Sequence, residues 1–265
     1  MDFRDKPTDR PTGAELVNPY DDIREKSGQV EEMFDSIAPA YDFMNTAMTF
    51  GLHNTWRRKA LTAATSCFVP AAQLSILDIA TGTGDVAFEL HERFRNARVV
   101  GLDLSEGMLG VARAKLAKCD AEARRLVSFE QGDSLHMRFG DSTFDIITVA
   151  YGVRNFERIE QGLREMARVL KPGGALCIIE LSEPTGRITL PMYRLYSRHL
   201  IPLAGRLVSG DSRAYSYLPE SIAAAPQRDR MTALMASAGL SQCRWRSLTF
   251  GAVTYYIATR QDDAK

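Results

Sequence analysis

A chain of 265 residues with 45% hydrophobic and 25% charged residues has the composition of a folded globular protein. That composition excludes intrinsic disorder, a collagen-like repeat and a disulfide scaffold. The 33 Lys and Arg balance the 33 Asp and Glu, so the net charge does not support binding to nucleic acid. Four scattered cysteines without zinc-ligand spacing predict reduced thiols, a cytoplasmic protein and no metal site.

The chain starts with a polar, proline-rich segment, and we expect residues 1–28 to form a flexible tail. This segment has no apolar core of a signal peptide. Elsewhere no apolar run approaches the ~20 residues of a membrane span. We therefore expect a single domain over residues 29–260, without a secretion signal or a transmembrane helix.

Downstream of the tail, predicted strands alternate with predicted helices. This alternation is typical of a parallel α/β sheet with helices on both faces. A helix over 228–238 precedes the last two strands, which bring the expected sheet to seven strands. The expected strands are 74–80, 98–104, 126–133, 144–152, 175–181, 241–248 and 253–259.

A turn that contains two glycines joins the first strand to the next helix in the run LDIATGTGD (77–85). Glycines let a ligand approach the backbone closely, and a helix N-terminus supplies free N–H groups beside them. Asp103 ends the second strand, where a carboxylate can accept both hydroxyls of a ribose, and Asp133 ends the third, near the expected adenine. An ordinary tight turn would explain the glycines but not the two carboxylates.

The type of nucleotide is indicated by Asp85, which follows the second glycine. A pyrophosphate at this helix N-terminus would face a negative charge, whereas a sulfonium or ammonium would be stabilised by it. The chain also lacks the Tyr-x-x-x-Lys pair of short-chain dehydrogenases. S-adenosylmethionine therefore fits better than NAD, and a NAD-linked oxidoreductase stays open as an alternative.

Several blocks of the sequence resemble a known family. The class I S-adenosylmethionine-dependent methyltransferases have motifs similar to LDIATGTGD (77–85), GLDLSEGML (101–109), EQGDS (130–134) and LKPGG (170–174). Within that class, the ubiquinone/menaquinone-biosynthesis C-methyltransferases have blocks that resemble VEEMFDSIAPAYD (30–42) with its continuation from MN (44–45) through WRR (56–58), AYGVRNF (150–156) and YSYLPESI (215–222). The resemblance implies a Rossmann-like class I methyltransferase fold, S-adenosyl-L-methionine as cofactor and a polyprenyl quinol as substrate.

Residue by residue, the resemblance implies cofactor contacts along the first three strands. Thr83 and Asp103 match contacts at the glycine loop and the ribose, and Asp133 with Ser134 matches the pair beside the adenine. Ala150 stands where some relatives carry a polar residue, so a contact there would have to come from the Tyr151 hydroxyl or a backbone group. The expected cofactor-binding residues are Ala80, Gly82, Thr83, Gly84, Asp103, Asp133 and Ser134.

Methylation at carbon needs an electron-rich ring, so the substrate must be the reduced quinol and not the electrophilic quinone. Loss of a quinol proton drives charge onto the adjacent ring carbon, which calls for a base or an ordered water and for a cation beside the phenolate. We expect Arg154 to act through water or as that cation, with a surface salt bridge as its alternative. Asn155 would orient the substrate oxygen.

Three acidic or phenolic residues complete the expected site. Tyr41, with Asp42 beside it, would line the opposite wall of the substrate site, or these two residues would only cap and pack a helix. Asp85 would be either a carboxylate on the cofactor side or a partner of a quinol hydroxyl. The expected catalytic residues are Arg154, Asn155 and Tyr41.

Other methyl acceptors fit the sequence poorly. After the fourth strand the chain reads AYGVRN and not the Asp/Asn-Pro-Pro-Tyr/Phe block of amino-group methyltransferases, and no Pro-Cys pair exists for cytosine methylation. The resemblance therefore implies conversion of demethylmenaquinol to menaquinol, and we expect no nucleic acid as partner. The alternatives are a 2-polyprenyl-6-methoxy-benzoquinol substrate and a catalytically silent binding scaffold, and a homodimer stays open.

Residues 184–222 break the strand–helix pattern and form the expected substrate-binding insertion. Between Pro184 and Gly210 apolar residues alternate with four arginines and no acidic residue occurs. This pattern predicts an apolar lid or channel for an isoprenoid tail, in transient contact with anionic headgroups at the inner face of the cytoplasmic membrane. The alternative is a helix packed on the sheet with its arginines in solvent. The arginines are Arg187, Arg194, Arg198 and Arg206.

Overall fold

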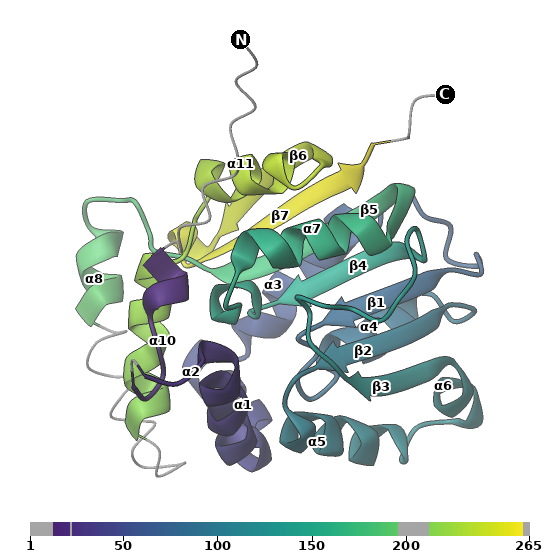
Figure 1. The fold of residues 1–265 in the computed structure, drawn as a ribbon, viewed down its shortest axis with the longest axis horizontal. Helices are drawn as coiled ribbons and strands as arrows, with labels where there is room; N and C mark the ends of the chain where they lie inside the picture. Colours follow the sequence, from purple (N-terminus) through teal and green to yellow (C-terminus); the bar gives the residue numbers. More distant parts are fainter. Residues whose placement is uncertain (1–12, 22, 196–211, 262–265) are drawn as a thin grey trace.

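Seven strands form one sheet in the order β3-β2-β1-β4-β5-β7-β6 (Figure 1). Strands β1 to β5 pair in parallel, and β7 runs antiparallel to both of its neighbours. The computed structural model describes residues 13–21, 23–195 and 212–261. This topology confirms the expected class I methyltransferase fold. The strands are β1 (Ser75–Ile79), β2 (Arg98–Asp103), β3 (Val127–Gln131), β4 (Phe144–Ala150), β5 (Leu170–Leu181), β6 (Leu240–Leu248) and β7 (Val253–Arg260).

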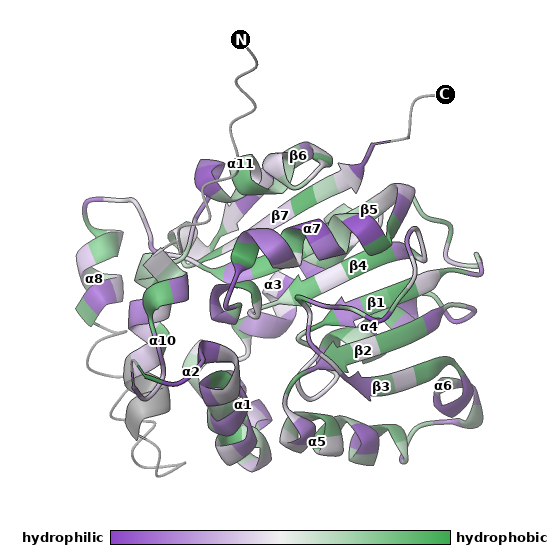
Figure 2. Cartoon of the chain, in the orientation of Figure 1, coloured by the Kyte–Doolittle hydropathy of each residue, from purple (hydrophilic) through white to green (hydrophobic). Residues whose placement is uncertain are grey.

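The sheet is covered on both faces because its central strands are apolar on both sides (Figure 2). In β1, Leu77 and Ile79 belong to one buried cluster and Ile76 to another, and all three side chains are fully buried. Burial of apolar surface at roughly 25 cal/mol per Å² drives this packing. One face is covered by α7 (Ile159–Val169) and α11 (Asp229–Ser237), and the other by α3 (Leu52–Ala64), α4 (Asp85–Arg93) and α5 (Glu106–Leu116).

Helix α7 ends at Val169 as the Lys-Pro-Gly-Gly run predicts, but that run already belongs to β5. The register between β4 and β5 shifts here, and Gly173 has a φ of 73°. Lys171 lies 2.8 Å from Asp145 across the shift. A bulge can absorb proline and glycine within a strand, so β5 begins five residues before the predicted position.

A layer of short helices covers the carboxyl ends of the strands (Figure 1). Their shared core contains Met33, Met44, Met108 and Tyr217. Sequence reasoning placed no helix between residues 29 and 64, although three lie there. The cap helices are α1 (Lys26–Ile37), α2 (Tyr41–Thr49), α8 (Thr189–Leu195) and α10 (Ser212–Ala224).

The expectation of a flexible tail over residues 1–28 is wrong for most of residues 13–28. Residues 13–16 form a 3-10 helix in which Ala14 is fully buried. Lys26 is buried too, and its ammonium donates to the carbonyls of Ala14, at 2.7 Å, and Arg154, at 3.2 Å. The Ile159 N–H donates to Glu15 at 2.6 Å. These hydrogen bonds hold residues 13–28 against the rest of the protein, because a buried charge such as the Lys26 ammonium needs hydrogen-bond partners.

The insertion 184–222 contributes α8 and α10 to the cap, so its described part lies beside the other cap helices and not on a sheet face (Figure 1). Arg194 lies 3.3 Å from Glu183, so this arginine has an acidic partner just outside the insertion. Arg198 and Arg206 lie outside the described residues. Over the described ranges, no helix has the length and apolar character that a membrane crossing requires.

Candidate functional site

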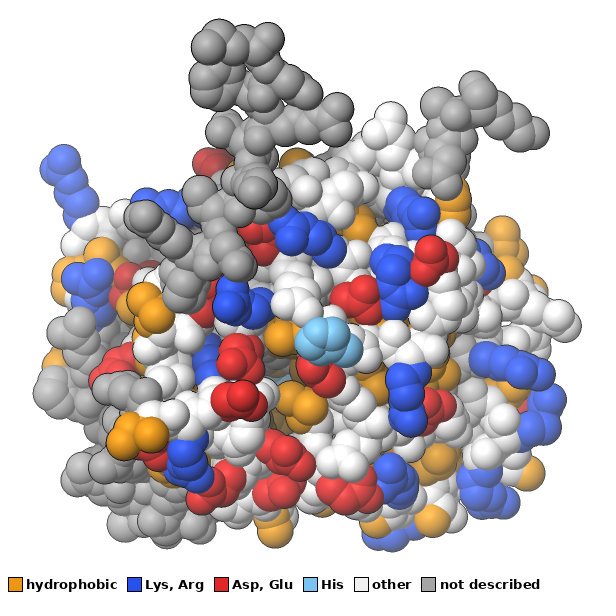
Figure 3. Space-filling view, in the orientation of Figure 1, with side chains coloured by type: hydrophobic (Ala, Val, Ile, Leu, Met, Phe, Trp, Pro, Cys, Tyr) orange, Lys and Arg blue, Asp and Glu red, His pale blue; other side chains and the backbone are white. Residues whose placement is uncertain are grey.

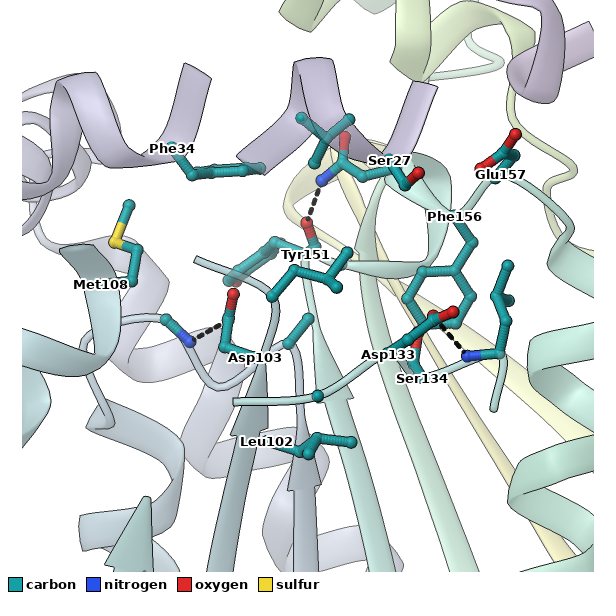
Figure 4. Close-up of a pocket in the computed structure, with 18 of the residues that line it drawn as sticks. Ser27, Phe34, Leu102, Asp103, Met108, Asp133, Ser134, Tyr151, Phe156 and Glu157 are labelled. Atoms are coloured by element: carbon teal, nitrogen blue, oxygen red, sulfur yellow. Dashed lines mark hydrogen bonds between the residues drawn. The ribbon is translucent and has the colours of Figure 1, made fainter. Parts of the chain in front are cut away.

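A first cavity opens at the carboxyl ends of β1, β2 and β4, between the sheet and α1 (Figure 4). Asp103 and Asp133 reach it from the sheet side, while Ser27 and Phe34 of α1 lie across from them. Ligands of open α/β sheets bind at this edge. Five of the seven cofactor-binding residues expected from the sequence line this cavity: Ala80, Gly82, Asp103, Asp133 and Ser134.

The turn after β1 is held in an unusual backbone conformation. Ala80 has a φ of 50° and Gly82 a φ of 56°, both in the left-handed region. Asp78 anchors the turn, since it accepts hydrogen bonds of 2.6 Å from the hydroxyls of Thr81 and Thr148. Burial raises the pKa of Asp78 to about 7. The turn is therefore shaped before any ligand arrives.

Asp103 is oriented by backbone donors. The N–H of Gly82 donates to one carboxylate oxygen at 2.7 Å, and the N–H of Ser105 to the other at 3.0 Å. Burial raises the pKa of Asp103 above its ordinary value. Each oxygen keeps a further lone pair, so the carboxylate can still accept two hydroxyls.

Asp133 and Ser134 follow β3 and line the side of the cavity away from α5 (Figure 4). Asp133 accepts the Leu135 N–H at 2.8 Å and contacts the His136 ring at 3.0 Å. Leu102 and Phe156 supply apolar walls nearby. A flat heteroaromatic ring with polar edges fits between such walls and carboxylates.

Two glycine-loop positions do not line the cavity. The Thr83 hydroxyl is buried and donates to Asp42 of α2 at 2.6 Å. Gly84 has a φ of 86°, and a Cβ there would lie 2.7 Å from the Phe129 ring. Thr83 thus connects the glycine loop to cap helix α2, and Gly84 permits close packing against Phe129. Their placement supports these structural roles and not direct contact with the cofactor.

Asp85 lies in a network of charges outside both cavities. It contacts Lys115 at 2.9 Å and Arg57 at 3.2 Å, and Lys115 also contacts Asp42 at 2.6 Å. Burial alone would raise the pKa of Asp85, but Lys115 and Arg57 hold it below its ordinary value. Asp85 and Asp42 therefore join α2, α4 and α5, which argues against both ligand roles expected for Asp85.

A second cavity of about 310 Å³ lies between the cap helices and the edge of the sheet. Its walls are apolar almost throughout, with contributions from α1, α2, α3 and α10. Arg154 is the one cation among the described lining residues. The main apolar and aromatic lining residues are Met33, Ile37, Met44, Met48, Leu52, Trp56, Leu181, Tyr217 and Ile222.

Arg154 forms a buried ion pair, so the alternative of a surface salt bridge is wrong. Its guanidinium lies 2.7 Å from Glu180 of β5 and donates to the Tyr151 carbonyl. Burial alone would lower the pKa of Arg154, but Glu180 raises it above its ordinary value. Among described residues, the buried Nε of Arg154 has no hydrogen-bond partner. A permanently charged group with one free donor suits stabilisation of an anion, not proton abstraction.

Asn155 lies beside Arg154 but faces the other cavity. It lines the first cavity, and its amide oxygen accepts the Tyr217 hydroxyl at 3.0 Å. This places Asn155 on the cofactor side, whereas sequence reasoning put it at the substrate oxygen. The contact also fastens α10 to the segment after β4.

The two cavities meet at Phe34, Tyr41 and Tyr151, which line both of them. Tyr151 has a φ of 60°, and its buried hydroxyl has no partner among described residues. The next residue, Gly152, cannot carry a side chain without a clash, because a Cβ at this position would lie 2.5 Å from the Ala80 Cβ. The strained turns after β1 and β4 therefore pack against each other at the junction of the cavities.

Several lining residues carried no signal in the sequence that would have singled them out. Phe34, His53 and Trp56 come from helices α1 and α3, before the first strand. Phe34 reaches the site because the cap covers the strand ends, whereas His53 and Trp56 reach it from α3, which packs against β5 and β7. The blocks around residues 30–58 did mark the region as part of the resemblance, without assigning these positions a role.

Comparison with known proteins agrees with this architecture. The family model described as ubiE/COQ5 methyltransferase family matches residues 22–260. Demethylmenaquinone methyltransferase of Bacteroides fragilis is 44% identical over 93% of this chain and 98% of that protein. The ubiquinone/menaquinone biosynthesis C-methyltransferase UbiE of Geobacter sulfurreducens is 40% identical over 90% of this chain and 91% of that protein.

A solved structure shares the fold. Phosphoethanolamine N-methyltransferase 2 of Haemonchus contortus, in complex with S-adenosylhomocysteine, has a TM-score of 0.58 and 15% identity, and covers 77% of this chain and 53% of that one. At this identity the likeness concerns the fold alone. A family model that spans the sheet, the cap and both cavities excludes a NAD-linked oxidoreductase. The chain belongs to the ubiE/COQ5 methyltransferase family.

Proposed function

We propose that this protein transfers the methyl group of S-adenosylmethionine to a ring carbon of a polyprenyl quinol, and that demethylmenaquinol is the acceptor. The observation that carries the proposal is the pair of cavities that share Phe34, Tyr41 and Tyr151. One cavity has carboxylates at strand ends and the other is apolar. A nucleoside donor has polar groups that match the carboxylates of the first cavity, and an isoprenoid acceptor has an apolar tail that matches the second cavity.

The first cavity fits the methyl donor. Asp103 has lone pairs for two ribose hydroxyls, and Asp133 with Ser134 can bind the polar edge of adenine. Ala80 and Gly82 supply exposed backbone beside them. The donor is consumed in each turnover and is therefore a substrate, and when bound it supplies a methyl group activated by the adjacent sulfonium.

The second cavity fits the acceptor. A naphthoquinol ring can reach the junction at Tyr41 and Tyr151 while its tail follows the apolar wall toward α8 and α10. Arg154 lies at this cavity with a free Nε donor, which supports its role as the cation beside a phenolate. Alignment of the ring carbon with the methyl group accounts for much of the rate enhancement.

Exposed apolar side chains line the second cavity or directly neighbour residues that line it; we call Phe50, Met192 and Phe250 its rim. Phe50 is 85% exposed and lines the cavity, and Phe250 and Met192, 83% and 66% exposed, directly neighbour lining residues. Exposed apolar side chains next to an apolar cavity are typical of interaction sites. This rim supports a transient contact with a bilayer, through which a membrane-dissolved quinol could enter the cavity.

Charge over one face of the molecule supports the same assignment. Figure 3 shows basic and acidic side chains intermixed, with acidic ones gathered over α1. Helix α1 carries Glu31, Glu32 and Asp35. A face of this kind does not attract a phosphate backbone, so nucleic acid is a poor substrate.

The test is incubation of the full-length protein with methyl-labelled S-adenosylmethionine and chemically reduced quinols. Label should enter the ring of demethylmenaquinol, and the oxidised quinone should remain unlabelled because its ring is electrophilic. A 2-polyprenyl-6-methoxy-benzoquinol runs in parallel, and preferential labelling of that ring would reassign the substrate. Absence of label from both quinols would support a silent scaffold.

The rim is tested with Phe250→Ser and Met192→Ser, neither of which lines a cavity. We expect reduced co-sedimentation with phosphatidylglycerol-containing vesicles and normal turnover of a detergent-dissolved quinol. Val69→Ser is the matched control, since Val69 is 65% exposed, precedes the amino end of β1 and lines neither cavity. Equal sedimentation of all three variants would exclude the rim as a membrane contact.

A further inference from the structure

Quinol methylation needs a group that removes the hydroxyl proton, and Arg154 is unsuited to that task because its guanidinium stays charged. The titratable side chains among the described lining residues of the second cavity are four tyrosines, Arg154 and His53. Burial raises the pKa of Tyr41, Tyr151 and Tyr217, so these phenols keep their protons at neutral pH. An unburied tyrosine has a pKa of about 10 and keeps its proton as well. Of these groups, His53 alone has an ordinary pKa near neutrality.

We propose that His53 is the general base that removes the quinol hydroxyl proton in this protein, with Thr49 and Asn45 holding its ring in the reactive tautomer. The inference rests on the proposed function and adds to it the base and its positioning residues. His53 belongs to α3, is 8% exposed and lines the acceptor cavity.

The tautomer follows from a short chain of hydrogen bonds. The Thr49 hydroxyl lies 2.6 Å from the Asn45 carbonyl and 2.8 Å from Nδ1 of His53. A hydroxyl has one hydrogen, and the carbonyl can only accept, so Thr49 donates to Asn45 and accepts from the Nδ1–H of His53. Nε2 then carries the lone pair. Within the described chain no hydrogen bond to Nε2 is present, so this nitrogen is available to a ligand.

The charges around His53 keep it neutral before it reacts. Burial, and the Arg57 guanidinium one turn away on α3, lower the pKa of His53, while Asp42 of α2 and Asp85 of α4 oppose them. Arg154 lines the same cavity, where its charge is paired with Glu180. A neutral imidazole can accept a proton over the physiological pH range.

The step balances without any further reactant. Nε2 takes the proton of the hydroxyl adjacent to the methylated carbon and leaves a phenolate. The ring carbon then forms a bond to the methyl carbon while the methyl–sulfur bond breaks, with its electron pair retained on sulfur. Loss of the ring carbon's own proton to solvent then restores the aromatic ring, and the oxygen that gave its proton to His53, now a phenolate again, takes that proton back from the imidazolium. One proton is released to solvent overall.

The experiment compares His53→Gln with the wild-type enzyme over pH 5 to 9, with the same labelled donor and reduced quinol. We expect kcat to fall by about 10²–10⁴-fold, the usual contribution of a general base, with unchanged affinity for S-adenosylhomocysteine. The ascending limb of the wild-type pH profile should disappear. His91→Gln is the matched control, since His91 lies on α4 and lines neither cavity.

Two further variants keep the test decisive. Added imidazole should restore turnover to His53→Ala, which leaves space for it, and not to His53→Gln. Thr49→Val removes the acceptor for Nδ1 and should lower kcat with little effect on donor affinity. Turnover of His53→Gln within threefold of wild type, or an unchanged ascending limb, would overturn the inference. A wild-type enzyme that methylates no quinol would instead overturn the proposed function.

Discussion

The Arg154 guanidinium lies 2.7 Å from the Glu180 carboxylate in the interior, where their side chains are only 7% and 3% exposed. The backbone N–H of Arg154 donates to the same carboxylate at 3.2 Å. Because isolated buried charges are costly, this pair fastens the segment after β4 to β5. A candidate catalytic residue is thus also a structural one, and the two roles need separate tests.

Glu180→Gln leaves the Arg154 charge without its partner. We expect the free energy of unfolding to fall by about 3–5 kcal/mol, measured by urea denaturation. The double variant Arg154→Met, Glu180→Leu should recover most of that stability, since an apolar pair can replace a buried ion pair. Methyl transfer should remain lost in the double variant, and wild-type turnover there would remove Arg154 from the mechanism.

Asp103→Asn tests the ribose contact with little change of shape. The amide cannot accept from both backbone donors and both hydroxyls, so we expect affinity for S-adenosylmethionine to fall about tenfold to a hundredfold, on the scale of a lost charge-assisted hydrogen bond. Isothermal titration calorimetry measures this affinity. Asp141→Asn is the control, because that side chain is 73% exposed. Equal affinities in the two variants would contradict the assignment.

Gly152→Ala tests the close approach of the turns after β1 and β4. The new Cβ would lie 2.5 Å from the Ala80 Cβ, so the glycine loop must shift and donor affinity should fall. Gly110→Ala makes the same change in α5, where no atom lies within 4 Å, and should stabilise the helix by up to about 1 kcal/mol. Thermal unfolding measures the stability of both variants, and isothermal titration calorimetry measures their affinity for S-adenosylmethionine. Normal donor binding by Gly152→Ala would contradict the packing argument.

Asp78 makes stability depend on pH. Its folded-state pKa of about 7 exceeds the ordinary value of 3.8 because the charged form is disfavoured by burial. The neutral form is therefore favoured in the folded state, so the contribution of Asp78 to stability is fully present below about pH 4 and is lost as pH rises through about 7. The full effect is on the order of 4 kcal/mol. Denaturation midpoints should fall over that range in the wild type and less in Asp78→Asn.

The sheet was predictable because its strands are local apolar runs separated by turn signals. All seven strands lie where the sequence placed them, apart from the earlier start of β5. Asp103 and Asp133 were found because a carboxylate at the end of a parallel strand has a known relation to the ligand edge. Local pattern was sufficient for these features.

The cap could not be predicted in the same way. Its positions depend on contacts such as Thr83 with Asp42, in which side chains far apart in sequence share one hydrogen bond. Asp85 looked available to a ligand because neither Arg57 nor Lys115 is near it in the sequence. His53 lies within a block of the family resemblance, but the block assigns it no role, and only its place in the folded cavity singles it out.

The second cavity is lined by residues from both the first and the last quarter of the chain. Trp56 donates its indole N–H to Thr249 at 2.8 Å across 193 positions of sequence, and both residues line that cavity. During synthesis, the ribosome must therefore complete nearly the whole protein before the cavity can close. A nascent chain that ends after β4 already holds Asp103 and Asp133 but exposes the apolar cap, so late synthesis is the stage at which aggregation competes most with folding.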